Sequence, residues 1–404
     1  MKIGFLSVFN YGHNIGGVEN HIYFLSRALS NKQDVKIYIF QPIFITKNNN
    51  LKEIEIVNNN IIRVYIFLFP NIFVRIINKL NRLSGMKFIG YFIGFINKAR
   101  YCFYYKDIAK NILKYNIDIL HQHDFISNIF TTKYIAKNTK IKCILTNHTG
   151  EYLFFKSNLF GRLILRILLN HFSAIIGPSK ELTPETHNSF TIYNGVDLNC
   201  FNIPSTFEKQ KIRLKYGLSE SDYLIFCPRR WAPTKGIIYL IESILRYKYP
   251  SNIKFLFAGD QYKDYPEYRK KIESLILKVK EKDRIIRFGN LDINDIIHVY
   301  KMSDVVIIPS LMEAVSLSAL EAMASGCAVI ATKVGGMLEI IKDKENGLLI
   351  APANPKEIFD AVMMLYFNKE LHNLIVYNSL QVVKNFSWDY IAEETLKIYR
   401  KILN

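Results

Sequence analysis

The chain has few cysteines, lacks a long apolar run and has far fewer acidic than basic residues. Its cysteines are Cys102, Cys143, Cys200, Cys227 and Cys327. They are scattered and show no Cys-x-x-Cys spacing, which indicates reduced cytosolic thiols rather than a disulfide framework or a zinc site. The most apolar charge-free run, residues 88–97, is about half of a bilayer span. We therefore expect no transmembrane helix.

The deficit of acidic residues gives the chain a formal net charge of +18, from 53 Lys and Arg against 35 Asp and Glu. Such a charge favours an anionic partner: a nucleotide diphosphate, a phospholipid surface or a nucleic acid. Part of it could also follow from base composition, because Lys, Ile and Asn are all abundant. Hydrophobic residues make up 50% of the chain, which argues against disorder, and a length of 404 residues predicts two domains.

Short apolar runs alternate with helical patterns, as in βα units that build parallel sheets. The first half has predicted strands at Lys2–Phe9, Val35–Gln41, Ile61–Phe69, Ile117–Leu120, Cys143–Asn147 and Ala174–Pro178. The second half has them at Tyr223–Cys227, Lys254–Ala258, Ile285–Phe288, Val305–Ile308, Ala328–Ala331 and Gly347–Ile350. We expect an α/β protein with doubly wound domains over residues 1–200 and 201–385, followed by an amphipathic helix within 386–404.

The most specific signal is a pair of carboxylates, Glu313 and Glu321, eight residues apart. Glu313 follows a predicted strand and Glu321 lies on the predicted helix that comes next. Ligands of open α/β sheets bind at this end of the strands, and a helix N-terminus attracts phosphate. The backbone N–H groups expected there are those of Ala314, Val315, Ser316 and Leu317. The spacing suits a nucleotide sugar, with Glu321 on the ribose, the diphosphate at the helix N-terminus and Glu313 on the sugar. The alternative is two solvated glutamates on a surface helix.

Two turns that follow predicted strands offer further contacts for an anion. Gly16 and Gly17 precede a helix, and glycine there lets backbone N–H groups close on a phosphate. Arg229, Arg230 and Lys235 follow the first strand of the second half. Fixed cations at that place can stabilise the charge that develops on a diphosphate when its bond to a sugar breaks. A plain glycine turn and a solvated basic turn are the alternatives.

Four motifs, in this order along the chain, resemble the signature of the retaining glycosyltransferases of family 4, or glycosyl transferases group 1. They are Gly16-Gly17-Val18-Glu19, Asn194-Gly195-Val196-Asp197, Arg230-x4-Lys235-Gly236, and a stretch that runs from Ser310-x-x-Glu313 through Leu320–Gly326 to Gly335-Gly336-x-x-Glu339. The resemblance implies the GT-B fold, with two facing Rossmann-like domains, a cleft between them and a final helix packed back on the first domain. It also implies transfer of a sugar from a nucleotide diphosphate sugar to a hydroxyl acceptor, with retention at the anomeric carbon.

The resemblance assigns roles to single residues. Arg230 lies five residues before Lys235, the usual gap in the family, and Arg229 is a neighbouring candidate for the same role. His148 matches a family histidine that contacts the donor sugar. The stretch Ala314–Ser316 stands where the family usually has Gly-Phe-Gly, so no sugar preference carries over.

Two further candidates, His123 and Glu339, also follow predicted strands, with a structural histidine and a helix cap as the alternatives. We expect no metal and no cofactor. His121 and His123 are only two residues apart and no third ligand is evident nearby. Nor does the chain have the Asp-x-Asp triplet that holds a metal in glycosyltransferases of the other common fold.

Residues 71–115 contain nine Lys or Arg against one acid, Asp107, with aromatic residues between them. This pattern suits the interface of an anionic membrane. We therefore expect a protein in the cytoplasm that is peripheral on the inner face of the cell membrane and acts on a surface-polysaccharide or lipid-linked glycan. A solvated helix with a buried aromatic face is the alternative for this segment.

Two other functions remain open at this stage. A nucleotide-sugar epimerase of the same fold would use the same donor pocket but would require no acceptor. A basic nucleic-acid-binding protein would explain the charge without catalysis and would bind DNA or RNA with a steep salt dependence. The ordered motifs argue against nucleic acid as a partner, because basic charge alone does not require two spaced glutamates.

Overall fold

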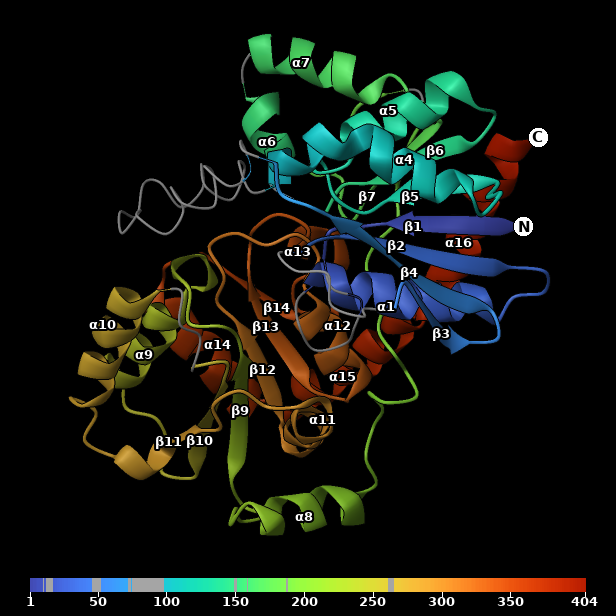
Figure 1. The fold of residues 1–404 in the computed structure, drawn as a ribbon. Coiled ribbons are helices and arrows are strands. Elements are labelled where there is room, and N and C mark those ends of the chain that lie inside the picture. Colours follow the sequence, from blue (N-terminus) through green and yellow to red (C-terminus); the bar gives the residue numbers. More distant parts are fainter. Residues whose placement is uncertain are drawn as a thin grey trace. The chain divides into compact units, whose positions relative to one another are not determined.

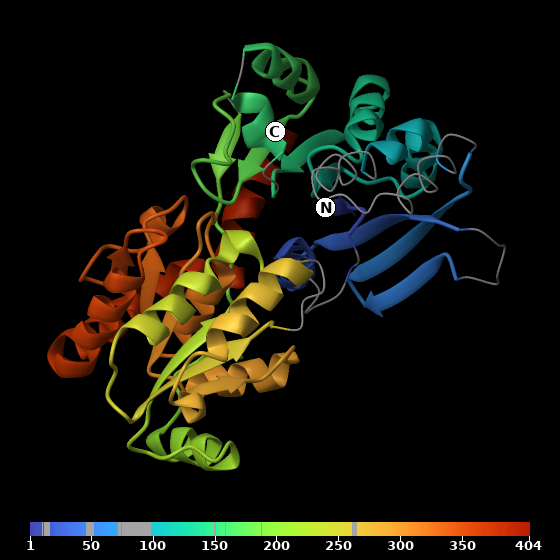
Figure 2. The same cartoon turned by 90° about the vertical axis from the view of Figure 1, so that its left-hand side faces the viewer.

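The computed structural model describes residues 1–9, 11, 17–45, 52–71, 74, 98–148, 151–157, 159–186, 188–260 and 265–404. The chain divides into two compact α/β units, shown in Figure 1 and, turned by 90°, in Figure 2. The N-terminal unit consists of Met1–Tyr193 and Ile391–Asn404, and the C-terminal unit of Asn194–Tyr390. Of the expected segments, Gly16 and most of residues 71–97 lie outside the described residues.

The N-terminal unit has a sheet of eight described strands in the order β3-β4-β2-β1-β5-β6-β7-β8. They are β1 (Lys2–Leu6), β2 (Lys36–Phe44), β3 (Ile54–Asn58), β4 (Ile61–Leu68), β5 (Ile119–Gln122), β6 (Lys142–Thr146), β7 (Ala174–Gly177) and β8 (Ser189–Thr191). Neighbours run parallel, except for the antiparallel edge pair β3–β4. The strand order reverses at β1, which pairs with β2 on one side and β5 on the other. Ligands of such sheets bind at the carboxyl ends of the strands beside the reversal.

The helices of this unit cover its sheet. Those that the structure describes are α1 (Gly17–Ser30), η1 (Arg100–Tyr104), α4 (Tyr105–Leu113), α5 (Ile129–Asn138), α6 (Glu151–Lys156), α7 (Leu159–Leu169) and, from Ile391 onward, α16 (Trp388–Leu403). Ile108 of α4, Ile135 of α5 and Leu165 of α7 share one apolar cluster with the strands. α16 is held by a 2.7 Å ion pair between Glu393 and Lys32 of the segment that follows α1.

The C-terminal unit has a fully parallel sheet of six strands in the order β11-β10-β9-β12-β13-β14. They are β9 (Tyr223–Pro228), β10 (Ile253–Ala258), β11 (Ile285–Arg287), β12 (Val305–Ile308), β13 (Ala328–Thr332) and β14 (Leu348–Ile350). β9 pairs with β10 on one side and β12 on the other, so the order reverses between β9 and β12. β12 and β13 are buried along their whole length, as expected for parallel strands covered on both faces.

Most helices of the C-terminal unit bury apolar side chains, whereas η2 (Pro233–Lys235) buries none. The others are α8 (Thr206–Lys215), α9 (Ile237–Arg246), α10 (Pro266–Ile276), η3 (Lys282–Arg284), α11 (Ile293–Met302), α12 (Leu317–Ala324), α13 (Met337–Ile340), α14 (Pro355–Phe367), α15 (Lys369–Val383) and η4 (Lys384–Phe386). α9 shows the helical period clearly, because Ile237, Leu240, Ile241 and Ile244 are all buried in one cluster with β9 and β10.

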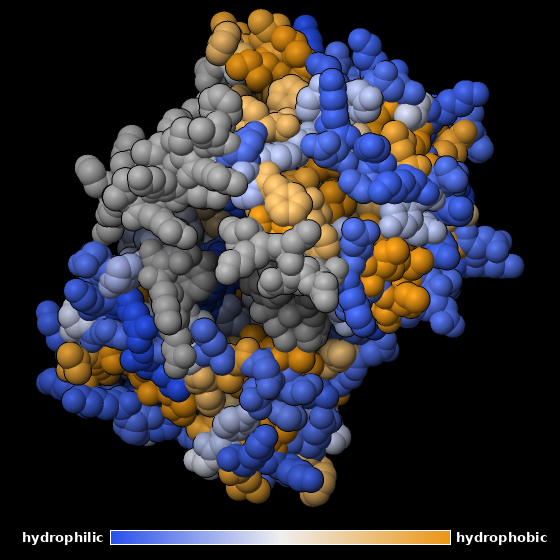
Figure 3. All heavy atoms as spheres, viewed as in Figure 1, coloured by the Kyte–Doolittle hydropathy of each residue, from blue (hydrophilic) through white to orange (hydrophobic). Residues whose placement is uncertain are grey.

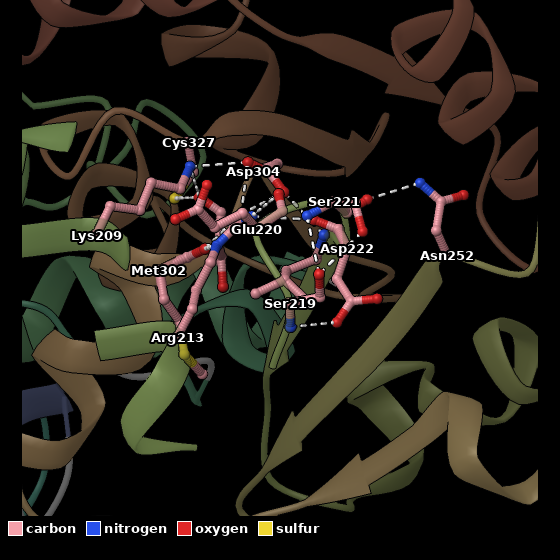
Figure 4. Close-up of polar contacts among 12 residues, drawn as sticks. Lys209, Arg213, Ser219, Glu220, Ser221, Asp222, Asn252, Met302, Asp304 and Cys327 are labelled. Carbon is pink, nitrogen blue, oxygen red and sulfur yellow. Dashed lines mark hydrogen bonds and ion pairs between the residues drawn. The ribbon is translucent and has the colours of Figure 1, made fainter. Parts of the chain in front are cut away.

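A buried charge network fixes α8 to the amino ends of β9 and β12, as Figure 4 shows. The Arg213 guanidinium donates to the backbone oxygen of Met302 at 2.9 Å and to both carboxylate oxygens of Asp304 at 2.9 and 2.8 Å. Asp304 also accepts bonds from Nζ of Lys209 at 2.7 Å and from the backbone N–H of Leu224 at 2.8 Å. The network lies at the opposite end of the sheet from the carboxyl ends of the strands, so its role is structural.

The predicted fold class, two doubly wound α/β domains, is confirmed. All twelve predicted strands are present, and the prediction missed β3 and β8. β3 is an exposed edge strand in which Ile56 is 74% exposed, so it lacks the buried pattern that marks the other strands. β8 has only three residues. No helix in the described part of the chain is both long enough and apolar enough to cross a membrane.

Candidate active site

The reversal of strand order in the C-terminal unit brings together the basic turn after β9 and the loop after β12. Oε2 of Glu313 accepts hydrogen bonds from Nζ of Lys235 at 2.9 Å and from the Ser310 hydroxyl at 3.1 Å, and it also pairs with the Arg229 guanidinium. Arg229 donates further to the Ser316 hydroxyl at 3.1 Å. All of these contacts lie at the carboxyl ends of parallel strands, where the sequence analysis predicts that the ligand binds.

Close backbone packing holds the two loops in this arrangement. The backbone N–H of Leu311 donates to the oxygen of Thr234 at 2.8 Å. Gly236 has a φ of +65°, and a Cβ there would lie 1.9 Å from the backbone oxygen of Pro309. A Cβ on Gly336, which follows β13, would likewise lie 2.8 Å from the carbonyl carbon of Ala314. Glycine is therefore required at both positions for the loops to approach each other.

The charges in this cluster shift one another's ionisation. Burial and the neighbouring charge of Arg229 together lower the pKa of Lys235 to about 8, although Glu313 opposes the shift. Burial acts to raise the pKa of Glu313, but Arg229 and Lys235 outweigh it, so the net shift is downward. The side chains of Arg229, Lys235 and Glu313 are only 9%, 19% and 12% exposed. At neutral pH the cluster therefore holds a carboxylate and two cations that are largely withdrawn from water.

Glu321 lies in the next helix, apart from this cluster. α12 begins at Leu317 with Ser316 as its N-cap, so Ala314 and Val315 belong to the preceding loop rather than to the first turn as expected. The Tyr300 hydroxyl donates to Oε2 of Glu321 at 2.7 Å. Burial raises the pKa of the Glu321 carboxyl, although this hydrogen bond and the charge of Arg229 act in the other direction. Glu321 is thus held in one orientation, in the middle of α12.

The N-terminal unit gathers three histidines at the carboxyl ends of its central strands. His123 follows β5, His148 follows β6 and His21 lies on α1. Nδ1 of His123 is 3.4 Å from Nε2 of His148, and the ring centroids of His21 and His148 are 4.4 Å apart. Burial is the main cause that holds the pKa of His123 and of His148 well below the usual value, so both rings are neutral at pH 7.

This histidine cluster is the group of described residues whose donor atoms could hold a metal ion, since one nitrogen from each ring lies within 4.8 Å of the others. The sequence shows no third ligand near His121 and His123, whereas the structure places His21 and His148 beside His123. His121 is not part of the cluster, because its two ring nitrogens are already engaged, with the Tyr399 hydroxyl and the Thr146 hydroxyl, both at 2.6 Å.

The remaining candidates have different settings. Arg230 is exposed, whereas its neighbour Arg229 is buried and contacts Glu313. Gly17 is the first residue of α1 and has open space where a Cβ would lie. Glu339 lies in the single-turn helix α13, where its backbone N–H donates to the oxygen of Gly336 at 3.1 Å.

The residues that sequence reasoning missed are Tyr300 and His21. Tyr300 is buried on α11, where an aromatic side chain reads as ordinary core. His21 lies 102 residues before His123, and no local pattern connects the two. The only available signal for His21 was its place on the helix that follows the first strand and its glycine turn.

Two family models together match most of the chain. The Glycosyltransferase Family 4 model matches residues 15–199, and the Glycosyl transferases group 1 model matches residues 208–382. An uncharacterized glycosyltransferase of Methanocaldococcus jannaschii is 28% identical over 298 residues, which are 70% of this chain and 75% of that protein.

Solved structures of the GT-B fold match both units. Sucrose-phosphate synthase from Thermosynechococcus elongatus has a TM-score of 0.76 at 18% identity, over 99% of this chain and 98% of that chain. Anabaena HepE in complex with UDP has a TM-score of 0.72 at 16% identity, over 99% of this chain and 100% of that chain. The expected GT-B fold is therefore confirmed.

Proposed function

The chain belongs to the family 4 glycosyltransferases, and we propose that it moves a sugar from a nucleotide diphosphate sugar to a hydroxyl acceptor with retention at the anomeric carbon. The observation that carries this proposal is the contact of Arg229 and Lys235 with Glu313, at the strand ends where such sheets bind ligands. Anabaena HepE, which shares the fold, was solved in complex with UDP. That complex supports a nucleotide as the ligand of this chain.

In the proposed reaction, the bond between the anomeric carbon and the diphosphate breaks and leaves extra negative charge on the diphosphate. Lys235, Arg229 and the exposed Arg230 stabilise that charge as it develops. Glu313 holds Arg229 and Lys235 in place before the donor binds, and such preorganisation makes fixed charges effective in catalysis. Glu313 also contacts the sugar in this proposal. Glu321, already oriented by Tyr300, binds the ribose hydroxyls.

The acceptor hydroxyl is proposed to attack from the face that the diphosphate leaves. The departing phosphate oxygen then takes the acceptor proton, so no separate enzymic base is needed. His148 contacts the donor sugar in this proposal, and its ring suits that role because burial keeps it neutral and able to donate or accept one hydrogen bond. The reaction as proposed requires no metal, because the cations occupy the place at the diphosphate where a metal would act.

We further propose that the acceptor is a surface-polysaccharide or lipid-linked glycan and that the enzyme works in the cytoplasm, at the inner face of the membrane. The five cysteines are all free thiols, which suits a reducing compartment. The high positive charge suits an anionic membrane surface.

A panel of nucleotide sugars tests the proposed donor class. Thermal stabilisation identifies the nucleotide that binds the folded chain, and slow hydrolysis without acceptor shows that the sugar–phosphate bond is broken. With an acceptor supplied, the anomeric configuration of the product, read by NMR, must match that of the donor. An inverted product would refute retention, and donor turnover to an epimer without acceptor would favour the epimerase.

A further inference from the structure

α7 of the N-terminal unit presents an apolar stripe to the solvent. Leu159, Phe160, Leu163 and Ile167 are 82%, 73%, 54% and 51% exposed. At 3.6 residues per turn these four side chains fall within about 100° of the helix circumference. They form one continuous strip, called here the α7 stripe. Figure 3 shows apolar side chains gathered over the position that α7 occupies in Figure 1.

The packing of α7 prevents this stripe from turning inward. The opposite face already buries Leu165 and Leu169 in the core of the unit. Gly161 is in tight contact with α6, because a Cβ at this position would lie 2.1 Å from the backbone oxygen of Phe155. The helix therefore cannot rotate without losing both contacts. An exposed apolar strip on a rigid helix indicates an interaction surface.

Basic side chains border the α7 stripe. Arg162 and Arg166 are exposed on the helix edge next to it. They also line a cavity of about 630 Å³ with Lys156, Glu185 and the apolar side chains of Leu169 and Phe172. Glu185 pairs with Lys156 at 2.9 Å. Of the four charged groups in the cavity wall, three are positive and one is negative, so the rim of the stripe is cationic.

We propose that the α7 stripe docks the N-terminal unit onto the surface of an anionic phospholipid bilayer. The helix lies in the plane of the interface with its four apolar side chains among the acyl chains, while Arg162 and Arg166 contact lipid phosphates. With 11 residues the helix is about 16 Å long, too short to span a membrane. An amphipathic helix of this kind binds through buried apolar area and attraction to anionic lipid together.

The basic rim distinguishes a bilayer from a second copy of the chain. In an antiparallel two-fold dimer through the stripe, the same patch meets itself, so Arg162 and Arg166 would face the same arginines of the second copy. Like charges opposite each other are unfavourable, whereas lipid phosphates are complementary to them. The inference deepens the proposed function, because it places the enzyme where a lipid-linked acceptor lies.

The test is sedimentation of the full chain with phosphatidylcholine vesicles, with and without phosphatidylglycerol, in low salt. Phe160→Ser with Leu163→Ser should weaken binding to anionic vesicles on the order of tenfold or more. Arg162→Gln with Arg166→Gln should bring anionic binding down to the neutral level. The matched control is Phe367→Ser with Leu374→Ser, which removes side chains 74% and 50% exposed on the C-terminal unit. It should bind like the wild type.

Three results would overturn the proposal. The wild type could show no preference for anionic vesicles, the stripe variant could bind them as well as the control does, or light scattering without lipid could show a dimer that the stripe variant dissociates. All substituted side chains are exposed, so the melting temperatures of the variants should change little. Donor hydrolysis without acceptor should be equal in every variant. If hydrolysis is absent throughout while vesicle binding behaves as expected, the proposed function fails and the docking surface stands.

Discussion

Lys235 gives the most direct test of the proposed chemistry, because its ionisation should control the rate. Burial and the charge of Arg229 lower its pKa from 10.5 to about 8. The difference of about 2.5 units corresponds to about 3 kcal/mol that disfavours the protonated form in the free enzyme. With a pKa near 8, roughly nine-tenths of the enzyme carries the Lys235 cation at pH 7 and about one-tenth at pH 9.

If the cation stabilises the leaving diphosphate, kcat/KM should fall about tenfold between pH 7 and pH 9, since kcat/KM reports the free enzyme. The bound diphosphate should hold the proton on Lys235, because an opposite charge nearby favours the charged form. The alkaline limb of kcat should therefore lie at a higher pH than that of kcat/KM. Burial raises the pKa of Cys102, Cys143, Cys227 and Cys327 to about 12, so these thiols do not produce a limb near 8.

Two variants separate this cation from other titrating groups. Lys235→Ala should lower kcat by on the order of 10²–10³ and should show no limb near pH 8. Lys235→Arg should keep part of the activity and lose the limb, because arginine stays protonated. Lys254→Ala, at the amino end of β10 and paired with Asp283, is the control and should keep the wild-type profile. A kcat/KM that stays flat from pH 7 to pH 10, or a limb that persists in Lys235→Arg, would refute the reasoning.

Four further outcomes are expected. Glu321→Ala should weaken binding of the free nucleoside diphosphate in calorimetric titration, whereas Glu313→Ala should leave it nearly unchanged and reduce transfer; equal losses would reject these separate roles. Arg230→Ala should lower kcat with little change in melting temperature, whereas Arg229→Ala should lower both, because it leaves the buried Glu313 with one cation fewer. Chelator should leave activity intact, and full loss with rescue by manganese would reject the metal-free reaction. Arg213→Met should destabilise the chain by about 3–5 kcal/mol in urea, because it leaves a buried carboxylate underpaired, and a loss below 1 kcal/mol (roughly the value of a surface pair) would contradict that role.

The sheets were predictable because buried parallel strands leave a strong local signal. β12, Val305–Ile308, is an uninterrupted apolar run followed by a loop, and its place in the sheet puts Glu313 at the expected end. β3 had no such signal, because an edge strand exposed to solvent does not need apolar side chains at alternate positions.

The choice between Arg229 and Arg230 could not be made from the sequence. Strand alternation predicts side-chain direction only within a strand, and β9 ends at Pro228. After β9, the direction of each side chain depends on the conformation of the turn. That conformation requires Gly236, which packs closely against the backbone of Pro309. The contact between His21 and His123 could not be predicted for a related reason. It depends on how α1 packs against the assembled sheet, where it contacts β2 and β4.

The charge of the C-terminal site offers a physical reason for a reaction without metal. Arg229, Arg230 and Lys235 contribute three positive charges and Glu313 one negative, so these four side chains carry a formal +2. A divalent metal would contribute the same charge, and a nucleotide diphosphate sugar carries two negative charges on its diphosphate. In the proposed reaction, these side chains neutralise the diphosphate without recruiting an ion, and a metal added there would meet three cations. Because the buried cations are fixed by Glu313 before the donor binds, they need little reorganisation as charge develops on the leaving group.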